Sequence, residues 1–261
     1  MMIKINYDKC SGCLECVKVC PFTVIDVEMD KPKVKDNKSC LKCMHCAATC
    51  HMDAITSDGK KAVLDREKKE LPEDFPQLLE EHILARRSFR HFKEEPVNRE
   101  ILEHAIELAC WAPSAKNEQG TKYIVVDKKE TIKYIMDEII KFAKETGAIP
   151  EIVSEYARGN NPVMGTAPTL LLAYAPNTNI NPLGDTFIKL TTIELMLQSQ
   201  GIGTCFAGYL MRLANGVPAL KELFMLPENN SFYGALMMGY PENEDYSKIP
   251  ERVIRQDIRW I

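Results

Sequence analysis

The sequence predicts a protein of the α+β class that is built from two unequal domains. Eight of the ten cysteines fall within the first 50 of the 261 residues, whereas the later chain alternates short apolar runs with long amphipathic stretches. A charged, proline-bearing segment separates these two regions and has the composition of a solvated connector. We therefore predict a first domain over 1–59, a linker over 60–76 and a second domain over 77–261.

The composition excludes several classes of protein. Apolar residues make up 45% of the chain and charged residues 27%, which is a globular balance with enough material for a core. The formal net charge of −4 gives no electrostatic case for nucleic acid or an anionic membrane. No apolar stretch approaches the roughly 20 residues of a spanning helix. The N-terminus also lacks the apolar core of a secretory signal, so we expect a cytoplasmic protein without membrane or nucleic-acid partners.

The cysteines of the first domain form a repeated motif. In a reducing compartment, regularly spaced cysteines hold metal more often than they form disulfides. The run Cys-x2-Cys-x2-Cys-x3-Cys occurs twice, with Cys10, Cys13, Cys16, Cys20, Cys40, Cys43, Cys46 and Cys50 as the candidate ligands. Thiolates are the soft ligands that iron–sulfur clusters use, and a cubane needs four of them. Two zinc sites are the alternative, but zinc ribbons use separated Cys-x2-Cys pairs rather than three cysteines in series.

Each run resembles the ligand pattern of the bacterial two-cluster ferredoxins, in which the fourth cysteine serves the other cluster. The resemblance implies two 4Fe-4S clusters. One would be held by Cys10, Cys13, Cys16 and Cys50, and the other by Cys20, Cys40, Cys43 and Cys46. His51 stands where proline usually follows the fourth cysteine. Because the eight cysteines already complete both ligand sets, we expect His51 to change hydrogen bonding near a cluster rather than to be a ligand.

Hydrophobic periodicity predicts the elements of the second domain. A first helix is indicated by the spacing of Leu78, Leu79, Ile83 and Leu84. A second helix over 98–110 begins at Asn98, a favourable N-cap that follows Pro96. Apolar runs predict strands over 122–126, 169–175, 204–209 and 233–239, and helices are expected over 130–146, 151–158 and 185–200. This mixture is typical of an α+β or α/β domain. The hydrophobic tail over 253–261 needs a surface on which to dock.

Four short motifs of this domain occur in a characteristic order. They are Arg86-Arg87-Ser88-Phe89-Arg90, the segment 112–119 (Ala-Pro-Ser-Ala-Lys-Asn-Glu-Gln), the segment 201–205 (Gly-Ile-Gly-Thr-Cys), and Gly239-Tyr240-Pro241 with Arg252. Together they resemble the flavin-dependent nitroreductase family over 77–261, and the whole chain resembles ferredoxin–nitroreductase fusion proteins. The resemblance implies an α+β domain with a central mixed sheet surrounded by helices. It also implies bound FMN and a homodimer whose subunits share each flavin site.

The candidate flavin ligands follow from this resemblance. From the residues alone, the arginines near position 88 suit a phosphate, although a solvated basic patch or pairing with Glu80 and Glu81 also accounts for them. By resemblance, the residues that contact FMN are Arg86, Arg87, Ser88, Arg90, Pro113, Ser114, Asn117, Gln119, Phe206, Ala207, Gly208 and Arg252. Gly120-Thr121 replaces the proline and tryptophan that the family usually has, which leaves the shape of the pocket beyond the flavin open.

No protein side chain is predicted to be the reacting group, because the N5 atom of FMN would carry the hydride. Cys110 and Cys205 lack metal-ligand spacing and lie in apolar runs, so we expect both to be buried as small hydrophobic residues. His82, His91 and His104 receive no catalytic role.

The sequence therefore predicts a flavin-dependent oxidoreductase. Two 4Fe-4S clusters would pass electrons to FMN for the two-electron reduction of a small aromatic or unsaturated acceptor, such as a nitroaromatic, a quinone or an activated alkene. The electrons would come from an external one-electron donor, such as ferredoxin or flavodoxin, or from NAD(P)H. Two alternatives remain: oxidation of a substrate or NAD(P)H with electrons leaving through the clusters, and a non-catalytic electron carrier or redox sensor.

Overall fold

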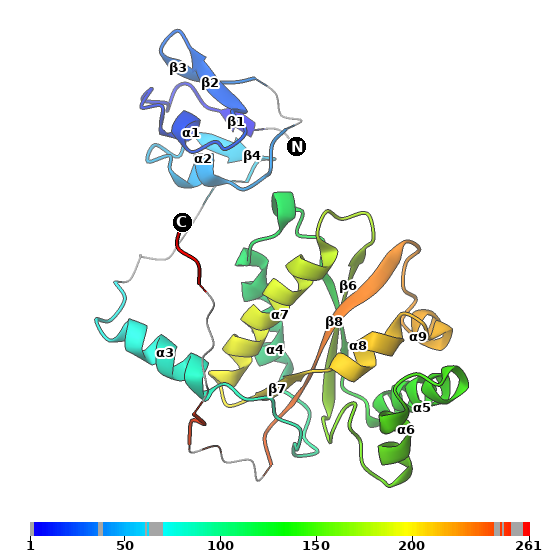
Figure 1. Ribbon diagram of the computed structural model, residues 1–261. Helices are drawn as coiled ribbons and strands as arrows, with labels where there is room; N and C mark the ends of the chain where they lie inside the picture. Colours follow the sequence, from blue (N-terminus) through cyan, green and yellow to red (C-terminus); the bar gives the residue numbers. More distant parts are fainter. Residues whose placement is uncertain are drawn as a thin grey trace. The chain divides into compact units, whose positions relative to one another are not determined.

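The computed structural model describes residues 3–35, 39–60, 62, 70–242, 246, 248–251 and 258–261. The chain divides into two compact units (Figure 1). The first comprises Met1–Pro72 together with Lys116–Glu118, and the second comprises Glu73–Ala115 and Gln119–Ile261. Of the predicted linker, residues 61 and 63–69 lie outside the described residues. None of the helices in the described part of the chain has the length and apolarity to cross a membrane.

The first unit reproduces the sequence repeat as a structural repeat. Its elements are β1 (Ile3–Ile5), α1 (Glu15–Lys18), β2 (Ile25–Glu28), β3 (Lys31–Val34), α2 (His45–Ala48) and β4 (Ile55–Ser57). Strand β1 pairs antiparallel with β4, and β2 pairs antiparallel with β3. Each short helix follows a residue in the left-handed region, Leu14 or Met44, both with φ of 61°. These matching turns bring the first three cysteines of each run to the start of a helix.

The second unit is built on a four-stranded sheet in the order β5-β6-β8-β7. The strands are β5 (Lys122–Val126), β6 (Thr169–Pro176), β7 (Gly203–Phe206) and β8 (Asn230–Gly239). All three strand pairs are antiparallel. The α+β class is thus confirmed. The sheet was expected to be mixed, but its only parallel pairing among the described residues is a single bridge between Ser88 and Thr204, because the segment at Ser88 pairs with the edge strand only there.

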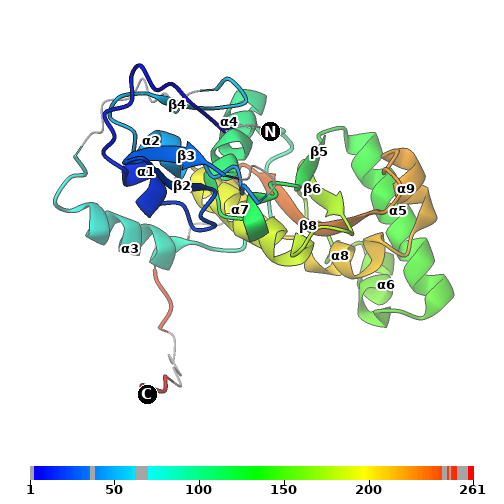
Figure 2. The ribbon, with the colours of Figure 1, turned by 90° about the horizontal axis from the view of Figure 1, so that it is seen from above.

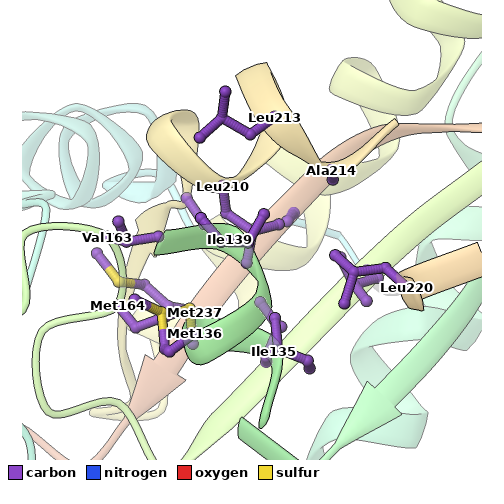
Figure 3. Close-up of a cluster of buried hydrophobic side chains, with 14 of the residues drawn as sticks. Ile135, Met136, Ile139, Val163, Met164, Leu210, Leu213, Ala214, Leu220 and Met237 are labelled. Carbon is purple, nitrogen blue, oxygen red and sulfur yellow. The ribbon is translucent and has the colours of Figure 1, made fainter. Parts of the chain in front are cut away.

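Helices cover both faces of this sheet (Figures 1 and 2). One face carries α4 (Arg99–Leu108) and α7 (Pro182–Gln198). The other carries α5 (Lys129–Thr146), α6 (Pro150–Ala157), α8 (Gly208–Ala214) and α9 (Pro218–Leu223). Because side chains alternate along a strand, Leu170 and Leu172 of β6 enter one core, whereas Leu171 and Ala173 enter the other. Figure 3 shows the first of these cores, where α5 and α8 pack over Met237 of β8.

Most predicted elements of the second unit form near their expected positions. The strand expected over 204–209 ends at Phe206 because α8 begins at Gly208. The Asn98 side chain caps α4 as predicted, by accepting hydrogen bonds from the amides of Glu100 and Ile101 at 2.9 and 3.3 Å. Of the hydrophobic tail, 253–257 lies outside the described residues, and Ile258, Trp260 and Ile261 are exposed.

Helix α3 (Phe75–Ala85) confirms the predicted helical spacing at the start of the second domain. Its His82 ring lies 2.9 Å from the carbonyl oxygen of Leu195 on α7. No residue of α3 is buried, however, and its apolar side chains Phe75, Leu78, Leu79, Ile83 and Leu84 are exposed. An amphipathic helix with an uncovered apolar face is typical of a surface that another chain covers.

Candidate cofactor sites

Two cavities in the first unit are bordered by cysteines. One is lined by Cys10, Cys13, Cys16 and Cys50, together with apolar neighbours such as Ile5 and Ile55. The other is lined by Cys20, Cys40, Cys43 and Cys46, together with Ile3 and Val24. Each cavity thus takes three cysteines from one run and the fourth from the other run. An apolar cavity with four sulfur atoms at its walls fits the ligand needs of a 4Fe-4S cluster.

Backbone amides point at the sulfur atoms of these cavities. The amide of Val24 donates to Cys20 Sγ at 3.3 Å, and the amide of Ala54 donates to Cys50 Sγ at 3.4 Å, four residues after the cysteine in each case. Burial, together with the neighbouring sulfurs of its own cavity, raises the pKa of the Cys46 thiol to about 11, although the Ala47 amide acts in the opposite direction. A thiolate in this cavity would therefore need a compensating positive charge, which the iron of a cluster would supply.

The described cysteines lie along the lining of the two cavities. Among the residues that the structure describes, no three His, Cys, Asp or Glu side chains converge closely enough to hold a single metal ion. A zinc ion needs four ligands at about 2.3 Å from one centre. A cubane is held at its corners, so its ligands can lie farther apart. The four cysteines that line each cavity fit the ligand set of such a cluster.

In the second unit, α7 anchors the segment that begins at Arg86. Arg86 Nη1 donates to Glu194 Oε1 at 3.3 Å, and the Glu194 side chain is only 4% exposed. Burial raises the pKa of the Glu194 carboxyl, while Arg86 and the hydroxyl of Thr204 lower it. Further along α7, Gln198 donates to the Arg87 carbonyl at 2.8 Å and accepts from the Arg87 amide at 3.2 Å. Two turns of one helix thus hold the arginine segment.

The same helix anchors the loop over 112–119. Asp185 Oδ1 accepts from the amide of Ala115 at 2.9 Å, and Lys189 Nζ donates to Gln119 Oε1 at 2.6 Å. Both α7 side chains are buried, each in a residue that is 3% exposed. The side chain of Gln119 donates from Nε2 to the carbonyl of Ala112 at 3.1 Å, and the backbone amide of Gln119 donates to Ser114 Oγ at 3.1 Å. The loop is therefore closed on itself and tied to α7.

This loop stores backbone strain. Lys116, Asn117 and Gln119 have φ of 47°, 55° and 51°, in the left-handed region that residues other than glycine rarely adopt. Such conformations persist only where surrounding contacts hold them, and they cluster at binding sites. At Gly120, which follows, a Cβ atom would lie 2.0 Å from the Nδ2 atom of Asn179, so a larger residue there would require the Asn179 side chain to move.

The edge strand β7 brings a third predicted segment to the same helix. Thr204 forms the parallel bridge with Ser88, and its carbonyl accepts from the amide of Phe89 at 3.0 Å. Its hydroxyl accepts from Gln198 Nε2 at 2.7 Å. After β7, the amide of Ala207 donates to the Ala235 carbonyl at 3.0 Å, and α8 begins at Gly208. Phe206 stacks on Phe187 of α7, with ring centroids 5.5 Å apart.

Two open cavities flank this edge. One, of about 480 Å³ including its mouth, is lined by Arg90, Phe206 and Gly208 among others, and open space lies where a Cβ of Gly208 would be. The other, of about 540 Å³, is lined by Arg86 and Gly203 among others. Guanidinium groups, exposed glycine backbone and an aromatic ring are the donors and surfaces that a flavin nucleotide needs.

The comparisons with known proteins agree with this geometry. The profile of the nitroreductase family matches residues 83–240, and that of the 4Fe-4S dicluster domain matches residues 2–51. The nitroreductase match covers more than half of the chain. The chain belongs to the nitroreductase family. It carries, at its N-terminal end, a 4Fe-4S dicluster domain fused to the nitroreductase domain.

Individual relatives match one part each. A ferredoxin from Methanothermococcus thermolithotrophicus is 45% identical over 56 residues, which is 21% of this chain and 93% of the ferredoxin. A putative NADH dehydrogenase/NAD(P)H nitroreductase from Archaeoglobus fulgidus is 28% identical over 171 residues, which is 65% of this chain and 90% of that protein. The crystal structure of a nitroreductase with bound FMN from Desulfitobacterium hafniense is 26% identical, with a TM-score of 0.59, and covers 69% of this chain and 96% of that one.

The structure places most of the predicted flavin residues in the second unit. These residues are Arg86, Ser88, Arg90, Pro113, Ser114, Gln119, Phe206, Ala207 and Gly208. Arg87 also lies there, but its guanidinium donates to the carbonyls of Leu84, Arg86 and Lys248. Asn117 belongs with Lys116–Glu118 to the first unit, and Arg252 lies outside the described residues.

One prediction about the remaining cysteines is confirmed and one is wrong. Cys205 is buried, and burial raises the pKa of its thiol. Cys110 is exposed, because it lies in the 3₁₀ turn Ala109–Trp111 that leaves α4, and only Ala109 of that turn is buried.

Sequence reasoning missed the polar residues of α7 that organise the nitroreductase site. Asp185, Lys189, Glu194 and Gln198 lie in a helix predicted from its apolar residues, and none was predicted to act at the site. One signal was present in the sequence. A charged residue on the buried face of a helix destabilises the fold unless it has a partner, so such a residue implies a partner elsewhere in the chain. Asp185, Lys189 and Glu194 each bind a residue that lies 70 or more positions away along the chain, so this pairing could not be read from the sequence.

Proposed function

We propose that two 4Fe-4S clusters and FMN form one electron path in this protein, which carries out the two-electron reduction of a small aromatic or unsaturated acceptor. The family assignment makes the chain an FMN-dependent oxidoreductase. The observation that carries the proposal is the pair of four-cysteine cavities in a chain whose larger part is a nitroreductase domain. When bound, FMN exchanges electrons singly or in pairs, which suits it to link one-electron clusters to a two-electron acceptor.

The proposed cluster ligands are the four cysteines of each cavity. Among these ligands, Cys16 and Cys46 are buried, whereas Cys13 is exposed at the surface. An exposed ligand gives an external one-electron donor, such as a ferredoxin or flavodoxin, a short approach to the first cluster. The thiolate-rich unit suits a reducing cytoplasm.

The proposed flavin site uses the residues that α7 positions. Arg86 and Ser88 would bind the phosphate end, and Arg90 the polar edge of the ring. Glu194 holds the Arg86 guanidinium by one N–H and leaves other donors of the fork for a phosphate. The loop over 112–119 would contact the ring through Pro113, Ser114, Asn117 and Gln119, the strand end through Phe206, Ala207 and Gly208, and Arg252 would add a phosphate contact.

The exposed apolar face of α3 supports a homodimer. Phe75, Leu78, Leu79, Ile83 and Leu84 are 37–53% exposed, and Leu183, Phe187 and Ile188 of α7 add to the uncovered apolar surface of the same unit. Exposed apolar surface of this kind mostly marks an interface. Because α7 also holds the flavin segments, a partner that covers these residues would border the flavin site.

Anaerobic absorbance spectra test the direction of electron flow. The purified chain is mixed first with NADH or NADPH, and then with reduced ferredoxin. Under the proposal, reduced ferredoxin bleaches both the cluster and flavin bands. Bleaching of the flavin band by a nicotinamide alone would favour the second candidate function, in which electrons leave through the clusters. This candidate is supported by the names of two relatives, each a putative NADH dehydrogenase/NAD(P)H nitroreductase. A reconstituted protein without flavin absorbance would overturn the proposal.

A further inference from the structure

The cavity at the end of β7 has a positive lining. It is bordered by two arginines, Arg90 and Arg212, by Tyr209 and Gly208, and by the apolar residues Val163 and Met237. No acidic side chain borders it among the residues that the structure describes. A pocket with this lining attracts a flat, apolar ligand that carries a negative charge.

Arg212 is held in this cavity by an aromatic ring. Its guanidinium carbon lies 5.5 Å from the centroid of the Tyr209 ring, which is within the range of a cation–π contact. A cation–π contact restrains the guanidinium without using its N–H groups as donors. The forked donors of Arg212 therefore remain available for a carboxylate, which they can bind through two parallel hydrogen bonds.

The position of Arg212 distinguishes it from the proposed flavin ligands. It follows Gly208 by four residues on α8, so it lies about one helical turn, or roughly 6 Å, along the helix from the proposed flavin contact. Sequence reasoning did not single it out, since it belongs to none of the family motifs. Arg90, in contrast, turns back toward the chain and donates from Nη1 to the Ser88 carbonyl at 3.1 Å.

We propose that Arg212 is a specificity residue that binds the carboxylate of an aromatic or unsaturated acceptor beside the flavin. The inference rests on the proposed function, because it places the acceptor in the cavity that the flavin segment borders. It narrows the substrate class from any nitroaromatic, quinone or alkene to those that carry an anionic group. Tyr209 orients Arg212, and Val163 and Met237 supply apolar surface for the ring of the acceptor.

A matched pair of ligands tests this inference. The oxidised, FMN-loaded full chain is titrated with 4-nitrobenzoate and with the neutral 4-nitrobenzamide, and binding is followed by the change in flavin absorbance. We expect the wild type to prefer the carboxylate by about tenfold, the size of one charge-assisted contact. Arg212→Gln should abolish this preference, and Arg212→Lys should restore part of it. The preference should also fall as salt is added, because the site is open to solvent.

The control variant is Arg158→Gln, which removes an exposed arginine that pairs with Glu155 and does not border the cavity. It should leave both dissociation constants unchanged. Retained flavin with an unchanged ligand preference in Arg212→Gln overturns the inference alone. Loss of FMN from Arg212→Gln also overturns it, because Arg212 would then be a flavin ligand. A wild-type chain that binds no FMN overturns the proposed function and this inference with it.

Discussion

Replacing Lys189 by methionine should separate the stability of the fold from its affinity for FMN. Lys189 is 3% exposed, and its ammonium group donates to the neutral amide of Gln119 at 2.6 Å. Burial lowers the pKa of this ammonium, while Asp185 and Cys110 raise it. The buried charge is thus costly to the folded chain, and its hydrogen bond fixes the orientation of a proposed flavin residue.

The substitution should affect the free energy of unfolding and the affinity for FMN differently. Burying an ammonium costs several kcal/mol, and the charge-assisted bond to Gln119 returns about 1.5–3 kcal/mol. Methionine removes both terms and fills a similar volume, but it also takes a nearby cation away from the buried Asp185. The free energy of unfolding of the FMN-free chain should therefore change by no more than about 2 kcal/mol. Gln119, however, loses the contact that holds the strained loop, so the dissociation constant for FMN should rise about tenfold, or 1.4 kcal/mol.

Two assays check these effects together. Urea unfolding of the FMN-free chain gives the stability, and fluorescence titration of free FMN gives the affinity. Lys133→Met is the matched control, because Lys133 is exposed on α5 and pairs with Asp137; it should change neither quantity appreciably. A Lys189→Met variant that is destabilised by more than about 2 kcal/mol while FMN binds as in wild type would refute the reasoning.

Three further predictions concern other parts of the sites. Arg86→Ala should weaken FMN binding by about 1.5–3 kcal/mol, as measured by equilibrium titration, and should also lower stability because the buried Glu194 loses its cation; unchanged affinity would remove Arg86 from the site. Cys43→Ala should halve the iron content and stop ferredoxin-driven turnover while FMN stays bound, and full turnover in this variant would contradict the proposed path. Glu194→Gln should flatten the dependence of stability on pH above about 4.5, the ordinary glutamate pKa. Since burial raises the folded pKa, the stability of the wild type falls as pH rises through that window, and urea unfolding at several pH values should show the variant to be the more stable of the two at neutral pH.

The local features of this chain could be predicted from sequence because they depend on neighbours in the chain. The spacing of the cysteines, the N-cap at Asn98 and the apolar run of β6 each belong to a few consecutive residues. The ends of β7 shifted because α8 begins at Gly208, and helix starts are set by local backbone geometry that apolar runs do not reveal.

The tertiary organisation of the site could not be predicted in the same way. Lys189 and Glu194 act through Gln119 and Arg86, which are 70 and 108 residues away, so only the folded chain shows that one helix serves both segments. The exposure of Cys110 was missed for a related reason. Its apolar neighbours belong to α4, but the turn that follows directs the thiol outward. Arg212 carried no sequence signal, because its meaning depends on the cavity and on the ring of Tyr209.

Anaerobic stopped-flow mixing of the FMN-loaded chain with reduced ferredoxin tests whether electrons reach FMN through the clusters. The absorbance of the clusters and of the flavin is followed in wild type and in Cys43→Ala. We expect that in wild type the clusters are reduced first and the flavin afterwards, and that in Cys43→Ala the flavin stays oxidised on the same timescale. Flavin reduction at the wild-type rate in Cys43→Ala would show that electrons reach FMN without the clusters, and the proposed electron path would then be wrong.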